Sequence, residues 1–188
     1  FCNYLFLFFE LTFIIGGTRS GKSSFAMQIA KKHQGVCYVA TANLAQISQT
    51  NDSEMLQRIK KHQENRPENW KTIEAPLELD KVVSGLNGEY DAILIDCITI
   101  YITNMLLGDL SAEEKEEYVI EAIERLCVVC KEVSPHVIIV TNEVGYGIVP
   151  ENPLARKFRD ISGYVNQLIA KEADSVFLVT AGIETKIK

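Results

Sequence analysis

Short runs of apolar, β-branched residues alternate along the chain with longer stretches in which apolar residues recur every three or four positions. The short runs predict strands buried on both faces, and the longer stretches predict amphipathic helices. The predicted strands cover residues 11–15, 36–40, 71–74, 92–95, 137–140 and 175–180. The predicted helices cover residues 22–33, 98–107 and 112–133, with two more that open near residues 51 and 152. This alternation predicts an α/β fold, a mostly parallel sheet covered by helices on both faces.

Two of these helices carry recognisable signals at their ends. Asn51 and Glu54 have the spacing of a capping box, and the helix they open should end before Pro67, because the residue before a proline disfavours helical backbone. Asn152 and Pro153 have the chemistry of an N-cap followed by proline in the first turn. We expect that last helix to bury Leu154, Phe158, Ile161, Val165, Leu168 and Ile169.

Composition places the chain among ordinary globular proteins. Its 188 residues predict one domain over residues 1–188, with 47% apolar residues available for a core. The net charge of −6 argues against binding to nucleic acid or to an acidic membrane. The apolar stretch 4–9 is too short to span a membrane, so residues 1–10 are interpreted as an N-terminal extension or part of the first strand.

The five cysteines are Cys2, Cys37, Cys97, Cys127 and Cys130. An odd number, with three inside apolar runs, suits a reducing cytoplasm better than a disulfide framework. The C-V-V-C spacing at residues 127–130 also occurs in redox and metal sites. It lies on a predicted helix, however, and no second Cys/His pair follows at zinc-ligand spacing. We therefore interpret both cysteines as core residues one helical turn apart.

A phosphate-binding loop follows the first predicted strand. The segment G-G-T-R-S-G-K-S matches the pattern G-x-x-x-x-G-K-[ST] in full and leads into a helix, the context that the motif requires. Its backbone amides and the helix N-terminus would hold the phosphates of a nucleoside triphosphate. Lys22 would reach the β- and γ-phosphates, Ser23 would be a ligand of Mg²⁺, and Arg19 could hold phosphate at two points. These features predict a P-loop NTPase fold of the RecA-like form.

Asp96 directly follows the strongly apolar predicted strand at residues 92–95. In P-loop proteins an acid at this point holds Mg²⁺, directly or through water. An acid here could also cap the helix that begins at once, and the two roles are compatible. Ligands of parallel sheets bind at the carboxyl ends of the strands, where Thr41, Asn142 and Glu143 also lie.

His62 lies on the helix that opens near residue 51. Arg58, Ile59 and Arg66 are three or four positions away and share its face. Two cations beside a histidine would suit a phosphate-rich ligand, and a neutral imidazole is a nucleophile toward phosphorus. The spacing alone, however, fits a surface histidine on a lysine-rich helix better.

Several longer blocks resemble one family, the bifunctional adenosylcobinamide kinase / adenosylcobinamide-phosphate guanylyltransferase of cobalamin biosynthesis. The blocks occupy residues 16–23, 38–42, 54–74, 95–104, 141–152 and 155–182. They include Y-V-A-T-A, R-I-x-x-H-x-x-x-R-P, I-D-C-I-T and T-N-E-V-G-Y-G-I-V-P-E-N. The resemblance covers nearly the whole chain from Ile14 on, and the last two motifs are far more specific than the P-loop.

The resemblance implies phosphorylation of adenosylcobinamide by ATP or GTP, and then transfer of GMP from GTP through a GMP-histidine at His62. It also implies a homotrimer whose site a neighbouring subunit completes. The implied GTP contacts are Gly16, Gly17, Thr18, Arg19, Ser20, Gly21, Lys22, Ser23, Ser24, Ala40, Thr41, Ala42, Gln63, Glu64, Asn65, Arg66, Glu74 and Asp96. We expect the corrinoid near residues 142–152 and the loop at 43–52, which is longer here than in the family.

Two other functions remain open at this point. The chain could be a P-loop kinase of another small molecule with a structural His62, or a nucleotide-binding switch that is not an enzyme. A covalent nucleotide adduct on His62 would separate the guanylyltransferase from both.

Overall fold

A computed structural model describes residues 10–43, 53–108 and 111–188 of the chain. The predicted contribution of residues 1–9 to the first strand, the capping residue Asn51 and most of the 43–52 loop lie outside this part. Within it, all strands belong to one seven-stranded sheet of order β3-β2-β4-β5-β1-β6-β7. The strands are β1 (Leu11–Gly16), β2 (Val36–Ala40), β3 (Lys71–Glu74), β4 (Ala92–Asp96), β5 (His136–Asn142), β6 (Ser175–Thr180) and β7 (Ile183–Lys186).

Six of the strands are parallel, and β7 pairs antiparallel with β6 at one edge. β1, β2, β4 and β5 form the middle of the sheet and are buried along nearly their whole lengths, as their continuous apolar sequences predict. β5 lies between β1, which leads into the P-loop, and β4, which ends at Asp96. This is the RecA-like arrangement, so the predicted α/β P-loop fold is confirmed.

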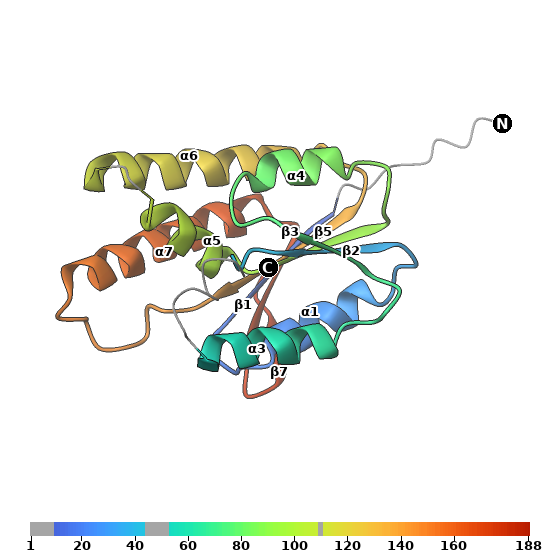
Figure 1. Ribbon diagram of the computed structural model, residues 1–188, viewed down its shortest axis with the longest axis horizontal. Helices are drawn as coiled ribbons and strands as arrows, with labels where there is room; N and C mark the ends of the chain where they lie inside the picture. Colours follow the sequence, from blue (N-terminus) through green and yellow to red (C-terminus); the bar gives the residue numbers. More distant parts are fainter. Residues whose placement is uncertain (1–9, 44–52, 109–110) are drawn as a thin grey trace.

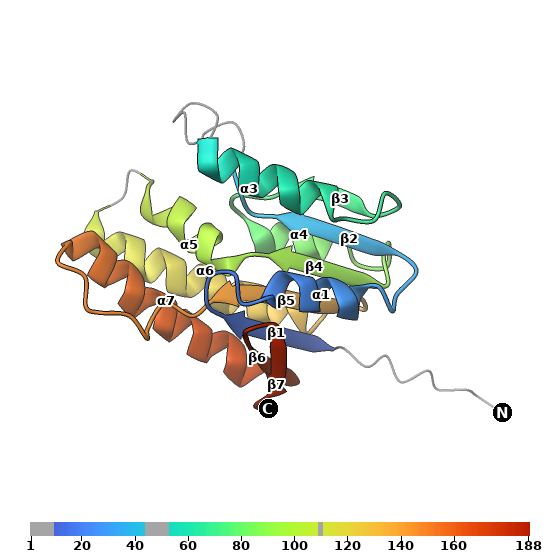
Figure 2. The same cartoon turned by 90° about the horizontal axis from the view of Figure 1, so that it is seen from below.

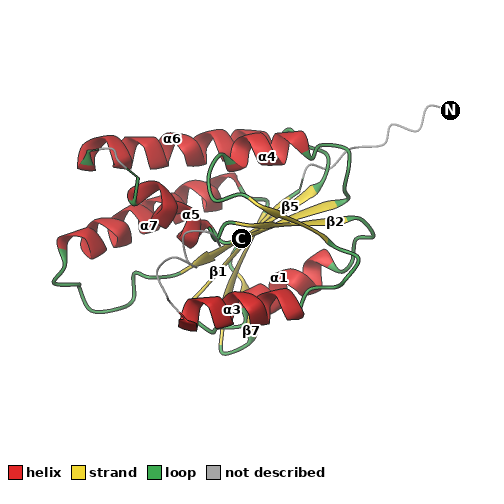
Figure 3. Cartoon of the chain, viewed as in Figure 1, coloured by secondary structure: helices red, strands yellow, loops and turns green. Residues whose placement is uncertain are grey.

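Helices cover both faces of the sheet (Figures 1 and 3). α1 (Lys22–Ala30) and α3 (Ser53–Glu64) lie on one face. On the opposite face lie α4 (Leu79–Gly85), α5 (Ile98–Leu106), α6 (Ala112–Cys130) and α7 (Pro153–Glu172). The larger core packs this second group against β1, β2, β4 and β5, and a smaller core lies beneath α1.

The described cysteines are buried, as the sequence predicts. Cys127 and Cys130 face the core from α6, and Cys37 and Cys97 lie in the sheet and at its edge. Burial raises the pKa of the Cys97 thiol to about 11 and that of Cys127 to about 12. No cluster of three or more metal-ligating side chains occurs among the described residues. Nor does any described helix have the length and apolar character needed to cross a membrane.

Three features differ from the sequence prediction. α4 was not predicted, because it has only seven residues and buries only Leu79 and Val83. β7 was not predicted, because all four of its residues are exposed and show no core-facing pattern. Leu154 was expected to be buried in α7 but is 53% exposed. The first turn of α7 extends beyond the sheet, so this residue has no core to face (Figure 2).

The start of α7 matches the predicted cap. The Asn152 side chain accepts hydrogen bonds from the backbone amides of Leu154 at 2.8 Å and Ala155 at 3.2 Å, and Pro153 occupies the first turn. Arg156 donates to the backbone oxygens of Pro150 and Glu151, so the helix also holds the loop that precedes it. The chain is therefore well fixed where it returns from the carboxyl edge of the sheet.

Candidate active site

The P-loop connects β1 to α1 and turns tightly enough to present its amides to one side. Arg19 and Gly21 have left-handed backbone, with φ of 58° and 97°. Gly21 also lies so close to the C-terminal hairpin that a β-carbon would be 3.1 Å from Gly182 Cα. The amide of Gly182 donates to the backbone oxygen of Ser20 at 2.8 Å. The β6–β7 turn thus packs against the P-loop and holds its backbone in place.

Lys22 opens α1 and points back across the loop. Its ammonium donates to the backbone oxygen of Gly17 at 3.3 Å. Burial lowers the pKa of Lys22, while Cys97 and Asp96 act in the opposite direction. A partly desolvated cation of this kind gains more from an anionic ligand than an exposed lysine would. The position therefore suits the predicted phosphate contact.

A cavity of about 670 Å³ extends from the P-loop along the carboxyl edge of β5, β4, β2 and β3. Its cationic side chains outnumber its carboxylates, which suits a triphosphate. The predicted site residues that line it are Thr18, Arg19, Ser20, Gly21, Lys22, Ser23, Ser24, Ala40, Ala42, His62, Gln63, Asn65, Arg66, Glu74 and Asp96. Asn142, which was expected near the corrinoid, also lines it. The lining residues that were not predicted are Met27, Tyr38, Ile59, Lys61, Thr72, Cys97 and Ile100.

Four predicted site residues lie outside the cavity lining. Gly16 and Gly17 form the start of the loop and contribute backbone, whereas the Glu64 side chain is exposed at the end of α3. Thr41 is fully buried, and its hydroxyl donates to the Cys97 oxygen at 2.8 Å and accepts from the Cys97 amide at 2.9 Å. Thr41 therefore fixes the end of β4 from the neighbouring strand.

Asp96 lies at the end of β4 and faces the cavity. One of its carboxylate oxygens accepts a hydrogen bond from the Tyr38 hydroxyl at 2.9 Å. The N-cap of α5 is Cys97, and no side chain caps it, so the alternative role of Asp96 as a helix cap is wrong. The second carboxylate oxygen and the Ser23 hydroxyl are hard oxygen donors, which are the ligands that Mg²⁺ prefers. The chemistry of these donors fits the metal.

A buried polar network fixes the end of β5 next to Asp96. The backbone amide of Asn142 donates to Thr99 Oγ1 at 2.8 Å, and the backbone oxygen of Asn142 accepts from the side-chain amide of Asn166 at 3.3 Å. Asn166 also accepts from the Thr141 hydroxyl at 3.1 Å. With its backbone held on both sides, Asn142 presents its side chain to the cavity. The polar T-N pair that ends an apolar strand was the sequence signal for this position.

His62 reaches the cavity from α3, which crosses the face of the sheet beside β2 and β3 (Figure 2). The His62 side chain is exposed, and it lines the cavity together with Ile59 and Gln63. Just beyond α3, the guanidinium of Arg66 lies 3.7 Å from the centre of the Tyr38 ring. The structure therefore brings the P-loop, Asp96 and His62 to one cavity, although the side chain of Arg58 lies outside the described part.

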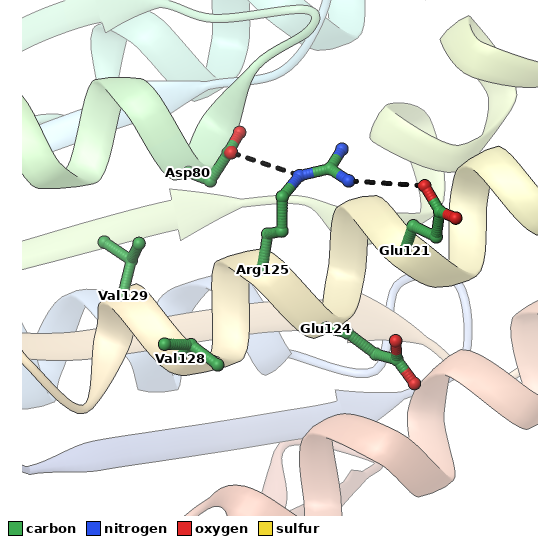
Figure 4. Close-up of a pocket in the computed structure, with 6 residues that line it drawn as sticks. All are labelled: Asp80, Glu121, Glu124, Arg125, Val128 and Val129. Carbon is green, nitrogen blue, oxygen red and sulfur yellow. Dashed lines mark ion pairs between the residues drawn. The ribbon is translucent and has the colours of Figure 1, made fainter.

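A second hollow of about 420 Å³ lies between α4 and α6, away from the P-loop (Figure 4). Its central side chain, Arg125, is paired with Asp80 and Glu121, both at 3.5 Å. The remaining lining is Glu124, Val128 and Val129. The Arg125 guanidinium is thus already paired with carboxylates, and the two valines are apolar, so the lining of this hollow offers no reactive group.

Comparisons with known proteins identify the family of this chain. The model of the family described as cobinamide kinase / cobinamide phosphate guanyltransferase matches residues 12–187. The bifunctional adenosylcobalamin biosynthesis proteins CobU of Salmonella typhimurium and Escherichia coli are 43% and 40% identical, each over 93% of this chain and 98% of theirs. CobP of Pseudomonas aeruginosa is 35% identical over 93% of this chain and 95% of its own. A solved KaiC-like protein from Pyrococcus horikoshii is 16% identical, with a TM-score of 0.48 over 90% of this chain and 70% of that one. The chain belongs to the cobinamide kinase / cobinamide phosphate guanyltransferase family.

Proposed function

We propose that this protein carries out both reactions of its family in one catalytic domain. It phosphorylates the hydroxyl of adenosylcobinamide with a nucleoside triphosphate, and it then transfers GMP from GTP to that phosphate. The observation that carries the proposal is the single cavity shared by the P-loop, Asp96 and His62. A kinase of another small molecule would need no histidine on α3 in that cavity, and a nucleotide switch would need none either.

In the guanylyl transfer, His62 is the nucleophile. A neutral imidazole nitrogen attacks the α-phosphorus of GTP, a phosphorus–nitrogen bond forms, and pyrophosphate leaves. A phosphate oxygen of the corrinoid then attacks the same phosphorus, the phosphorus–nitrogen bond breaks, and adenosylcobinamide-GDP is released. Lys22, Arg19 and the P-loop amides offset the charge that develops on the phosphoryl oxygens and on the leaving pyrophosphate.

In the kinase step, the corrinoid hydroxyl oxygen attacks the γ-phosphorus of ATP or GTP, and the nucleoside diphosphate leaves. The same loop binds the triphosphate, and Lys22 contacts its β- and γ-phosphates. Ser23 and Asp96 would hold Mg²⁺, which supplies charge neutralisation on the phosphates when it is bound. Both reactions then use one phosphate site, and only the second needs His62.

The corrinoid would approach from the loop that follows β5. This loop leaves the cavity at Asn142 and exposes large apolar side chains, with Ile148 97% and Tyr146 86% exposed. Arg156 and Arg159 hold the loop to α7 through backbone oxygens, so these side chains sit on a fixed support. An exposed apolar group beside a polar site suits a large, partly apolar substrate.

Incubation with GTP labelled at the α-phosphate tests the proposal. The protein should acquire an acid-labile, base-stable label that His62→Ala abolishes and that Gln57→Ala, on an exposed part of the same helix, leaves intact. His62→Ala should keep the kinase step, whereas Lys22→Ala should impair both reactions. Failure of the folded wild-type protein to take up label would overturn the transferase assignment.

The family resemblance also favours a cytoplasmic homotrimer. Light scattering of the purified protein, which gives the mass of the particle directly, tests the trimer. A monomer that is fully active would contradict a shared site.

A further inference from the structure

Tyr38 touches both halves of the proposed site. It lies on β2 with only 3% of its surface exposed, and its register neighbour on β4 is Leu94, two residues before Asp96. Its hydroxyl donates to Asp96 at 2.9 Å, and its ring lies 3.7 Å from the Arg66 guanidinium. One rigid side chain thus contacts both the proposed metal-binding carboxylate and the segment that follows the His62 helix.

The Arg66 side chain stacks on the Tyr38 ring and also forms a hydrogen bond with the Tyr38 side chain. Its Nε atom is buried and has no hydrogen-bond partner among the described residues. Its backbone amide donates to Gln63 at 3.2 Å, which ties it to the last turn of α3. Most described side chains of α3 are exposed, so these side chains contribute little packing to fix where the helix ends. A guanidinium stacked on a buried aromatic ring is a defined anchor for such a helix.

We propose that Tyr38 is a positioning residue that holds the Arg66 end of the His62 helix in register with Asp96. This inference rests on the proposed guanylyl transfer. The ring sets the place of Arg66, and through the last turn of α3 it sets where His62 lies in the cavity. The hydroxyl holds Asp96, which both reactions share. Tyr38 itself forms no bond to the reacting atoms.

Two substitutions separate the ring from the hydroxyl. Tyr38→Phe keeps the stacked ring and removes the hydroxyl with its hydrogen bonds to Asp96 and Arg66, so its effects on the kinase and the GMP-histidine rates should differ less than those of Tyr38→Leu. Tyr38→Leu removes the ring as well. It should lower the rate of His62 labelling about tenfold more than it lowers the kinase rate, because a stacked cation of this kind is worth about 1–2 kcal/mol. The ratio of the two rates is therefore the quantity to measure.

A measurement without nucleotide tests the structural part of the idea. Amides of residues 63–66 should exchange with solvent faster in Tyr38→Leu than in Tyr38→Phe, while those of β4 should stay protected in both. In an Arg66→Met background, Tyr38→Leu should no longer change the ratio of the two rates, because the partner of the ring is already gone.

Each outcome of these experiments either supports or contradicts the positioning role of Tyr38. An unchanged ratio in Tyr38→Leu, or the same ratio change in Tyr38→Phe, would overturn the positioning role while leaving the transferase in place. Equal exchange at residues 63–66 in both variants would overturn it too, and this readout holds even if one variant is less stable. Absence of label in the wild-type protein would instead overturn the proposed function itself.

Discussion

The replacement Gly16→Ala should destabilise the protein, because a β-carbon at this position has no room. It would lie 2.4 Å from Ser20 Oγ and 2.6 Å from the backbone oxygen of Val179. The buried Ser20 hydroxyl has no hydrogen-bond partner in the described part of the chain and can turn away, but Val179 belongs to β6, which pairs with β1 at Gly16. To reach an ordinary contact the strands must move apart by about 0.8 Å, a degree of overpacking that costs about 1–3 kcal/mol.

The neighbouring glycine provides a matched control. A β-carbon on Gly17 would meet nothing within 4 Å, and neither glycine has left-handed backbone, so the two variants differ in steric contact alone. Urea unfolding without nucleotide should show a loss of about 2 kcal/mol for Gly16→Ala, or a melting temperature lower by about 4–8 °C. Gly17→Ala should stay within about 0.5 kcal/mol of the wild-type protein.

The displaced strand would also move Ser20 and the loop that it anchors, so the affinity of Gly16→Ala for GTP should fall together with its stability. Calorimetric titration with GTP measures this directly. The reasoning is refuted if the two alanine variants unfold at the same urea concentration, or if Gly16→Ala unfolds at the same urea concentration as the wild-type protein.

Two further predictions concern parts of the fold away from the cavity. Asn152→Ala removes the cap of α7 and should lower the free energy of unfolding by about 1 kcal/mol, whereas Glu151→Ala, at an exposed neighbour, should change it little; equal effects in urea unfolding would count against the cap. Burial lowers the pKa of His136 below its ordinary value near 6.5, with Glu10 acting in the opposite direction. The unfolded chain therefore binds more protons, and stability should fall as the pH falls below about 6.5. His136→Gln should flatten this decline, and an unchanged slope would contradict it.

Much of the fold was predictable because its strands are buried on both faces. The predicted span 36–40 matches β2, and other predicted ends differ from the observed ones by three residues or fewer. Short or exposed elements such as α4 and β7 were not predictable in this way. These elements have too few buried residues to show a hydrophobic period. Their positions depend on which sheet face and which strand edge the rest of the fold leaves exposed.

The candidate site was predictable where local sequence sets the geometry, as in the P-loop and at Asp96. Tyr38 shows the limit of local reasoning. In the sequence it is one more apolar residue in a strand, and its bond to Asp96 depends on the register in which β2 pairs with β4. Nor can periodicity place α3, because the position of His62 over the cavity follows from the order of the strands beneath it.

The contact between Gly182 and the P-loop affects how sequence variation in this protein should be interpreted. Ala181 and Gly182 both have left-handed backbone, with φ of 54° and 80°, and their turn lies directly against the phosphate loop. A variant at this turn can therefore behave in genetic or binding experiments like a defect in nucleotide recognition, although neither Ala181 nor Gly182 lines the cavity. In an alignment, a glycine kept at this position would reflect mechanical support of the loop, and it should not be counted as a ligand contact.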